Sequence, residues 1–338
     1  MKNSSDLNDV KVSVLGAGSW GTTLADLLGR KGLRTTLWVR EAELLETMEK
    51  TGENEIFLPG VKISENVLPT GSLEVACRAP LIVCAVPTHG AREVFKEAAR
   101  FISDPETVIV SASKGIEEET GMRVSEIMAD MLPPVRAVVV LSGPSFAREV
   151  AMGKPTALCA ASANTEAALL VQKTFSTDCF RVYTNSDVTG VELGGALKNI
   201  IAIASGICGG LGLGPNARAA LITRGLAEMT RLGTALGARA ETFSGLSGLG
   251  DLVLTCTDEM SRNYTVGLRV GRGEKLWTIM SEMKMVAEGV RTSRAVKTLA
   301  ERHGVEMPIT GEVCSVLYED KDPRKAVMEL MTRRLRRE

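Results

Sequence analysis

The stretch at residues 11–32, KVSVLGAGSWGTTLADLLGRKG, constrains the fold of this chain more than any other. It starts with a short apolar run, continues through Gly16, Gly18 and Gly21, and ends in an apolar segment with helical spacing. Glycine tolerates the backbone angles of a tight turn, and its missing side chain lets a strand and a helix approach closely. The stretch therefore predicts a buried strand, a glycine-rich turn and a helix that packs back onto the strand.

Further apolar runs extend this pattern through the first half of the chain. They occupy residues 34–39, 79–87, 107–115 and 136–144, and we expect a last strand at 156–162. Helical segments alternate with the runs, and turn formers bound each run. Residues 51–72 are rich in Gly, Pro and Asn, so we expect an irregular excursion there. The alternation predicts a parallel sheet covered on both faces, an α/β fold of the Rossmann type.

The second half of the chain has a different character. From about Asp187 onward strand patterns vanish, and long segments rich in Ala, Leu, Gly and Met follow. Because 338 residues exceed one ordinary core, we predict a dinucleotide-binding Rossmann domain at 1–186 and a helical substrate and catalytic domain at 187–338. Residues 193–214 are apolar enough to suggest a membrane span, but their glycines and Lys198 favour a helix buried in a soluble core.

Composition narrows the classes of partner. Forty Lys and Arg residues against 41 Asp and Glu residues give a net charge of -1, so no overall field favours nucleic acid or a membrane surface. The seven cysteines include no C-x-x-C pair, which favours buried, reduced thiols in a cytoplasmic protein. With two histidines we expect no metal site. Residues 1–10 lack the apolar stretch of a signal peptide, and we expect the basic run from Arg333 to Arg337 to be a solvated helix end.

The ends of the predicted strands carry small or cationic residues, and ligands of open α/β sheets bind beyond these ends. The free N–H groups of a glycine-rich turn and of the helix after it suit a pyrophosphate, so we predict a dinucleotide site. The strand-end residues are Gly16, Gly18, Ser19, Trp20 and Gly21 after the first run, Arg40 after the second, Pro87 after the third, Lys114 after the fourth, and Gly143 and Ser145 after the fifth.

Arg40 bears on the choice of cofactor. An acidic residue commonly ends the second strand and binds the ribose hydroxyls, whereas this chain has Arg40 followed by Glu41. An arginine pairs with a 2′-phosphate that a carboxylate would repel. We therefore expect NADP(H) to be preferred, with NAD(H) possible. The alternative is that Arg40 stacks on adenine or faces solvent while Glu41 holds the ribose.

Lys198 interrupts an apolar helical stretch, one turn after Gly194 and Gly195. Lysine is seldom buried without a purpose, and the two glycines would leave a bare patch for a small ligand. A desolvated lysine can exchange a proton near neutrality. The alternative is a lysine that reaches solvent, with the glycines serving close helix packing.

Two later motifs place polar residues where they could meet a substrate. Asp251 and Thr255 are four residues apart on one helix face after a glycine-rich turn, so one could orient a lysine and the other could offer a hydroxyl. Ser261 could cap a helix whose first turn holds Arg262 and Asn263, an arrangement that suits a phosphate. Both motifs also suit ordinary caps of surface helices.

Taken together, seven blocks resemble bacterial NAD(P)-dependent sn-glycerol-3-phosphate dehydrogenases, in order and over nearly the whole chain. They are GAGSWGTTLA, AVPTH, SASKGIE, SGPSFAREV, LGGALKNIIAIASGI, GLSGLGDLVLTCT and SRNYTVG. The resemblance implies reversible reduction of dihydroxyacetone phosphate to sn-glycerol 3-phosphate for phospholipid synthesis. Two alternatives stay open: a 3-hydroxyacid or sugar-acid dehydrogenase of the same architecture, and an NADP-sensing regulator.

The resemblance also assigns roles to residues. It implies that Lys198 donates and accepts the proton, and Asp251 and Lys114 are further catalytic candidates. The expected substrate contacts are Lys114, Gly143, Ser145, Lys198, Asn199, Asp251, Thr255, Ser261, Arg262 and Asn263. The expected cofactor contacts, besides the glycines and Pro87, are Ser19, Trp20, Arg40, Lys114, Ala147, Arg262, Val286 and Glu288. We expect a small phosphate ester as partner, no nucleic acid, no stable membrane insertion and a cytoplasmic homodimer.

Overall fold

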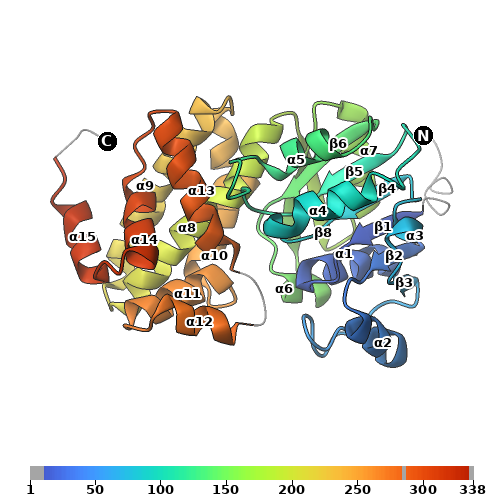
Figure 1. Ribbon diagram of the computed structural model, residues 1–338, viewed down its shortest axis with the longest axis horizontal. Coiled ribbons are helices and arrows are strands. Elements are labelled where there is room, and N and C mark those ends of the chain that lie inside the picture. The colour runs from blue at the N-terminus through green and yellow to red at the C-terminus, as the bar shows by residue number, and fades with distance from the viewer. Residues whose placement is uncertain (1–10, 284–286, 335–338) are drawn as a thin grey trace. The chain divides into compact units, whose positions relative to one another are not determined.

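The computed structural model describes residues 11–283 and 287–334, with elements labelled in Figure 1. The chain forms two compact units. The sheet unit comprises the residues up to Lys114 together with Arg123–Val191, and the helical unit comprises Gly115–Met122 and the residues from Glu192 onward. The chain thus passes from the sheet unit to the helical unit after Val191, a few residues beyond the predicted boundary between residues 186 and 187. Residues 115–122 belong to the helical unit although they precede that boundary, which the sequence did not predict.

The sheet unit is built on one sheet with the strand order β3-β2-β1-β4-β5-β6-β7-β8. Its neighbouring strands pair in parallel, except for the antiparallel pair β6 and β7. The strands are β1 (Val12–Leu15), β2 (Thr35–Trp38), β3 (Val67–Thr70), β4 (Leu81–Cys84), β5 (Val108–Ser111), β6 (Ala137–Ser142), β7 (Thr156–Ala161) and β8 (Phe180–Asn185). The predicted α/β fold and its six predicted strands are confirmed, but the predicted parallel pairing fails at one place, since β7 pairs antiparallel with β6.

Strands β3 and β8 correct the sequence prediction. We expected an irregular excursion where β3 lies and no strand where β8 lies. Both are edge strands with partly exposed faces, so neither shows the continuous apolar run of a central strand. Pro69 in β3 also weakens the strand pattern, although an edge strand tolerates proline.

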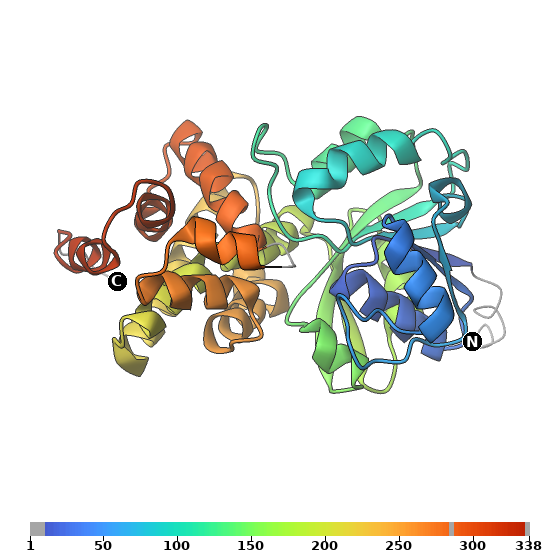
Figure 2. The ribbon, with the colours of Figure 1, turned by 60° about the horizontal axis from the view of Figure 1, so that its bottom comes forward.

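Helices cover both faces of this sheet, as Figure 2 shows. Helix α1 contacts α6 and α7, whereas α4 contacts α5 on the other face. The helices are α1 (Ser19–Arg30), α2 (Ala42–Thr51), α3 (Leu73–Ala76), α4 (Thr88–Ala98), α5 (Val124–Met131), α6 (Ala147–Ala151) and α7 (Thr165–Phe175). Every residue of β1, β4 and β5 is buried, as a parallel sheet between two helical layers requires.

The helical unit surrounds α8 (Val188–Gly210), whose first residues belong to the sheet unit. This helix is long and apolar enough to cross a membrane, and its apolar window is completely buried inside the protein. The surrounding elements are α9 (Gly214–Ala235), two short turns at Ala240–Ser244 and Leu246–Gly250, α10 (Asp251–Thr257), α11 (Arg262–Gly271), α12 (Leu276–Glu282), α13 (Glu288–Arg302), α14 (Pro308–Tyr318) and α15 (Pro323–Met331).

Glycines bring the backbones of α8 and α11 into contact. A Cβ added to Gly206 of α8 would lie 2.0 Å from the carbonyl oxygen of Tyr264, and one added to Gly267 of α11 would lie 2.0 Å from that of Ile203. The pairs Gly210 with Leu268 and Gly271 with Ile207 are almost as close, at 2.3 and 2.5 Å. Because both helices contribute glycines, the position of α11 is fixed by α8.

The seven cysteines are free thiols, and six of them are buried. Burial raises the pKa of Cys77 and of Cys256 to about 12, so these thiols stay protonated and unreactive at neutral pH.

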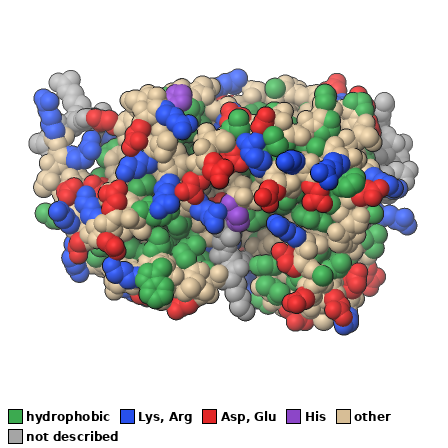
Figure 3. All heavy atoms as spheres, in the orientation of Figure 1, with side chains coloured by type: hydrophobic (Ala, Val, Ile, Leu, Met, Phe, Trp, Pro, Cys, Tyr) green, Lys and Arg blue, Asp and Glu red, His purple; other side chains and the backbone are tan. Residues whose placement is uncertain are grey.

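The surface carries both signs of charge: on the face drawn in Figure 3, acidic and basic side chains are interspersed over each unit.

The glycine contact between α8 and α11 can be tested with a matched pair of substitutions. We expect Gly206→Ala to lower the free energy of unfolding by about 1 to 3 kcal/mol, because the new methyl group overlaps the Tyr264 carbonyl. Gly311→Ala in α14 is the control, since a Cβ there meets nothing within 4 Å. It should stabilise the protein by roughly 0.5 to 1 kcal/mol through helix propensity. Denaturant unfolding of both variants measures the difference, and equal stabilities would contradict the close contact.

Candidate active site

The glycine-rich turn lies between β1 and α1, and its three glycines serve different purposes. Gly16 has a φ of +106°, which makes the tight turn. A Cβ on Gly21 would lie 1.9 Å from the Gly16 carbonyl oxygen, so this glycine lets α1 pack on the turn. A Cβ on Gly18 would meet nothing within 4 Å, and no side chain caps the start of α1. The open backbone and uncapped helix N-terminus form a cradle that suits an anion such as a pyrophosphate.

Residues expected beside this turn lie close to it. The Thr23 hydroxyl contacts the carbonyl oxygens of Ser19 and Ala147, at 2.8 and 3.3 Å, which places the start of α6 against α1. The indole N–H of Trp20 is buried and has no hydrogen-bond partner in the described part of the chain. Thr23 therefore links Ser19 and Ala147, two of the expected cofactor contacts. The sequence analysis did not single out Thr23 itself.

The other strand ends also carry the residues that the sequence predicts there. Arg40 follows β2 and is exposed, and Pro87 precedes the first turn of α4. The Ser113 hydroxyl donates to the carbonyl oxygen of Val86 at 2.6 Å, which ties the end of β4 to that of β5. These contacts hold the carboxyl edge of the sheet together.

Lys114, Gly143 and Ser145 meet at one carbonyl group. The Lys114 ammonium donates to the Gly143 carbonyl oxygen at 2.8 Å, and the Ser145 hydroxyl donates to the same oxygen at 3.0 Å. Gly143 has a φ of +144°, and a Cβ there would lie 3.0 Å from a Leu158 methyl group. The structure thus brings together three of the expected substrate contacts, within the sheet unit.

The helical unit holds the second cluster, centred on Lys198. The Lys198 ammonium donates to Asp251 Oδ1 at 2.6 Å and to Thr255 Oγ1 at 2.7 Å, and all three side chains are buried. The Thr255 hydroxyl in turn contacts the Asp251 carbonyl oxygen at 2.6 Å. Asp251 and Thr255 lie on α10 after a glycine-rich turn, as predicted, and they fix the ammonium in a buried position.

The structure gives a different reason from the predicted one for a glycine at position 194. We expected it to leave room for a small ligand next to Lys198. A Cβ on Gly194 would instead lie 2.5 Å from the Ser247 carbonyl oxygen, so this glycine admits the turn before α10. Lys198 does not reach solvent, because only 6% of it is exposed. The glycine serves close packing, and that packing brings Asp251 towards the lysine.

The turn at Ser261 forms the third part of the candidate site. The Ser261 hydroxyl accepts from the Tyr264 N–H at 3.2 Å and caps α11, as predicted. The Asn263 amide donates to Asn199 Oδ1 at 3.0 Å and accepts from the Gly289 N–H at 2.9 Å. Asn199, which follows the lysine on α8, is thus joined to the first turns of α11 and α13.

Arg262 and Glu288 act on each other electrostatically. Burial lowers the pKa of the Arg262 guanidinium, and the Glu288 carboxylate opposes this shift. Glu288 begins α13, where a negative charge is favourable. The remaining expected cofactor contact, Val286, lies outside the described residues.

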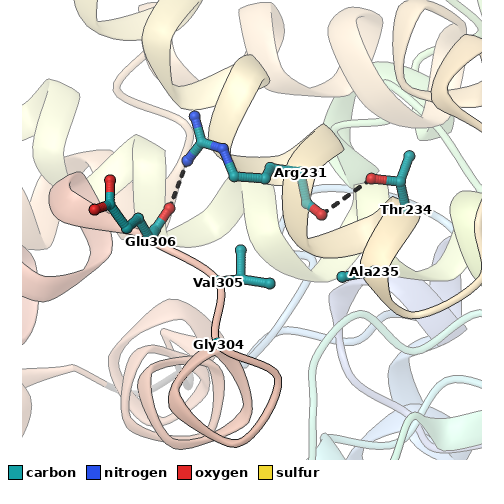
Figure 4. Close-up of a pocket in the computed structure, with 6 residues that line it drawn as sticks. All are labelled: Arg231, Thr234, Ala235, Gly304, Val305 and Glu306. Carbon is teal, nitrogen blue, oxygen red and sulfur yellow. Dashed lines mark hydrogen bonds between the residues drawn. The ribbon is translucent and has the colours of Figure 1, made fainter.

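A separate hollow of about 570 Å³ lies between α9 and the chain before α14 (Figure 4). Its lining includes Arg231, Thr234 and Glu306. Arg231 donates to the Glu306 carbonyl oxygen, and the Glu306 carboxylate pairs with Arg333 at 3.4 Å. Because the Arg231 guanidinium and the Glu306 carboxylate already have partners, the Glu306 carbonyl oxygen and Arg333, we attach no chemistry to this hollow. In the described ranges, no three His, Cys, Asp or Glu side chains lie together as they would to hold a metal ion.

Comparisons with known proteins show which family this chain is similar to. The family model for the N-terminal part of NAD-dependent glycerol-3-phosphate dehydrogenase matches residues 11–168, and the model for its C-terminal part matches residues 187–328. Glycerol-3-phosphate dehydrogenase (NAD(P)+) of Geobacter sulfurreducens is 56% identical over 331 residues, 97% of this chain and 98% of that protein. The enzyme of the same name from Citrifermentans bemidjiense is 55% identical over the same share of each chain.

A solved structure supports the same relationship. The crystal structure of glycerol-3-phosphate dehydrogenase from Coxiella burnetii superposes with a TM-score of 0.93 at 41% identity, covering 96% of this chain and 100% of that one. Both units of the chain are included in these matches. The chain therefore belongs to the NAD-dependent glycerol-3-phosphate dehydrogenase family.

Proposed function

We propose that this chain is an NAD(P)-dependent sn-glycerol-3-phosphate dehydrogenase that reversibly reduces dihydroxyacetone phosphate to sn-glycerol 3-phosphate for phospholipid synthesis. The observation that carries the proposal is the buried contact of Lys198 with Asp251 and Thr255, beside the capped turn of Arg262. The family and the names of the relatives support this reading. They do not favour the 3-hydroxyacid alternative, which would need the turn at Ser261 to bind a carboxylate.

Lys198 supplies the acid in this reaction. The dinucleotide, when bound, supplies the hydride that reduces the ketone carbon. The Lys198 ammonium stabilises the oxygen that becomes negative and delivers its proton there, and in the reverse direction the amine takes the proton back. Asp251 balances the buried charge, and Thr255 fixes the direction of the ammonium group. A proton donor held in this way needs little rearrangement when the substrate reacts.

The first turn of α11 is the proposed phosphate site. Arg262 gives a permanently charged, forked donor, and the helix that Ser261 caps adds backbone donors and the positive end of its dipole. On the sheet unit we assign Lys114, Gly143 and Ser145 to the substrate as well. Binding of the remote phosphate helps to orient the ketone.

The glycine-rich turn is the proposed pyrophosphate site. The space beside Gly18 is open because glycine has no side chain, and any larger residue there would fill it. Ser19 and Trp20 follow this turn directly, and Ala147 is linked to it through Thr23. We propose Arg262 and Glu288 as further cofactor contacts. We propose that Arg40 reads the 2′-phosphate, so that NADP(H) is preferred over NAD(H). We also propose a cytoplasmic homodimer, with no metal in the reaction.

Removal of the lysine tests its role as acid. Lys198→Met should lower kcat by roughly 10² to 10⁴, the usual effect of losing a general acid, while NADPH still binds. Because this change leaves the Asp251 carboxylate buried without its counter-charge, Lys198→Met/Asp251→Asn serves as the control for folding. The double variant should regain stability but no activity. Steady-state assays that retain activity within a few-fold would assign the proton to another group, with Lys114 the first candidate.

The phosphate assignment predicts a difference between two substrates. Unphosphorylated dihydroxyacetone should be a very poor substrate of the parent enzyme. Arg262→Ala should lose far more activity with dihydroxyacetone phosphate than with dihydroxyacetone, because only the first substrate carries the phosphate that the arginine is proposed to bind. Arg272→Ala, at the exposed end of the same helix, is the matched control and should change neither. Equal losses on both substrates would show that Arg262 serves the cofactor or the fold instead.

Substitutions at the two ends of β2 test the preference for NADP(H) over NAD(H). Arg40→Asp should raise the KM for NADPH much more than that for NADH, because it replaces a cation facing the 2′-phosphate with an anion. Arg34→Asp is the control: it makes the same charge change next to β2 at the opposite end, where the side chain is also exposed. An unchanged ratio of kcat/KM for NADPH and NADH in Arg40→Asp would remove Arg40 from phosphate recognition.

A further inference from the structure

We propose that Asn54 is a positioning residue for the cofactor, which aims the backbone N–H of Gly18 at the pyrophosphate. This inference rests on the proposed function of the glycine-rich turn. Asn54 lies in the excursion between α2 and β3, where sequence patterns indicate no site, and it is completely buried. Its role follows from which atoms it contacts.

The Asn54 amide is the link between the excursion and the turn. Its Nδ2 donates to the carbonyl oxygen of Ala17 at 2.8 Å and to Thr22 Oγ1 at 2.8 Å. Its Oδ1 accepts from the N–H of Phe57 at 3.0 Å. One side chain therefore contacts the middle of the glycine-rich turn, the first turns of α1 and its own loop.

These partners determine the orientation of the amide. A backbone N–H can only donate, so the atom that faces Phe57 must be the oxygen. A backbone carbonyl can only accept, so the atom that faces Ala17 must be the nitrogen. Both partners select the same orientation, and the exchanged orientation would lose both hydrogen bonds.

The contact with Ala17 sets the direction of the next N–H. The Ala17 carbonyl and the Gly18 N–H belong to one trans peptide unit, in which the two groups point in opposite directions. Asn54 holds the carbonyl towards the buried side. The Gly18 N–H is therefore directed to the other side, and within the described residues it has no acceptor. A Cβ added to Gly18 would meet nothing within 4 Å, so the backbone of this residue is open to a ligand, and we propose that the pyrophosphate binds there.

The excursion itself is held in place, so Asn54 has a fixed base. The Leu58 N–H donates to the Asn54 carbonyl oxygen at 2.8 Å, and the Ile63 N–H donates to that of Gly52 at 2.9 Å. Leu58 and Val61 are buried against Ala151 at the end of α6. Because α6 also contacts α1, the loop and the turn are parts of one packed layer.

Substitution of Asn54 should act on cofactor binding specifically. Asn54→Asp keeps the shape but places an oxygen against the Ala17 carbonyl, which repels it and releases the peptide unit. Loss of a charge-assisted N–H contact should raise the Kd for NADPH roughly tenfold to a hundredfold. With saturating NADPH, the KM for dihydroxyacetone phosphate and kcat should stay within about threefold, because Lys198 and Arg262 are untouched. Asn54→Leu is the neutral variant, and it should raise the Kd as well.

Two matched variants separate this role from general damage to α1. Asn66→Asp makes the same chemical change at the other end of α1, where the Asn66 amide donates to the Gly29 carbonyl oxygen at 2.9 Å. Thr22→Val removes the second acceptor of Asn54 and leaves the Ala17 contact. Neither should raise the Kd for NADPH more than about threefold.

Calorimetric titration measures the Kd for NADPH of each variant, thermal unfolding checks that it folds, and steady-state kinetics gives its kcat and KM. The inference is overturned if Asn54→Leu binds NADPH like the parent, since a loss confined to Asn54→Asp would be charge repulsion alone. It is also overturned if Asn66→Asp or Thr22→Val weakens binding as much. If Asn54→Asp does not fold, Asn54→Leu decides alone. A parent protein that neither binds NADPH nor reduces dihydroxyacetone phosphate would refute the proposed function itself, a result distinct from unaltered binding in the variants.

Discussion

The buried ion pair of Lys198 and Asp251 is the interaction on which the helical unit depends. An ammonium group deep in an apolar core is very costly unless a carboxylate and further acceptors surround it. Asp251 and Thr255 meet this need from α10, at 2.6 and 2.7 Å. For that contact α10 must approach α8 closely, and Gly194 permits it. The packing of α10 against α8 therefore forms the core of this unit and at the same time sets the geometry of the candidate site.

Glycine has a second use in this unit. The backbones of α8 and α11 touch through Gly206 and Gly267, so α11 has little freedom to shift along α8. The hydrogen bonds of Asn263 with Asn199 and Gly289 then attach the first turn of α11 to α8 and α13. A charged turn built on rigid helices can be held to within a fraction of an ångström, as recognition of a small phosphate ester requires.

Much of this could be predicted from the sequence, because much of it is local. Central strands appear as apolar runs, the Ser261 cap acts over three residues, and Asp251 and Thr255 share a face through helical spacing. Edge strands β3 and β8 lack that signal since one side faces solvent. The purpose of Gly194 and the part played by Asn54 depend on partners 53 and 37 positions away, which no local pattern encodes.

The contact between Asn54 and Ala17 shows that the glycine-rich turn is not a self-contained module. Its sequence motif spans six residues, yet the direction of its central peptide unit depends on a loop beyond the second strand and second helix. Transplanting GAGSWG into another strand and helix would therefore carry over the shape of the backbone but not the side chain that orients it. A designer who wants the phosphate site must move the excursion together with the turn, or build a new amide donor beneath it.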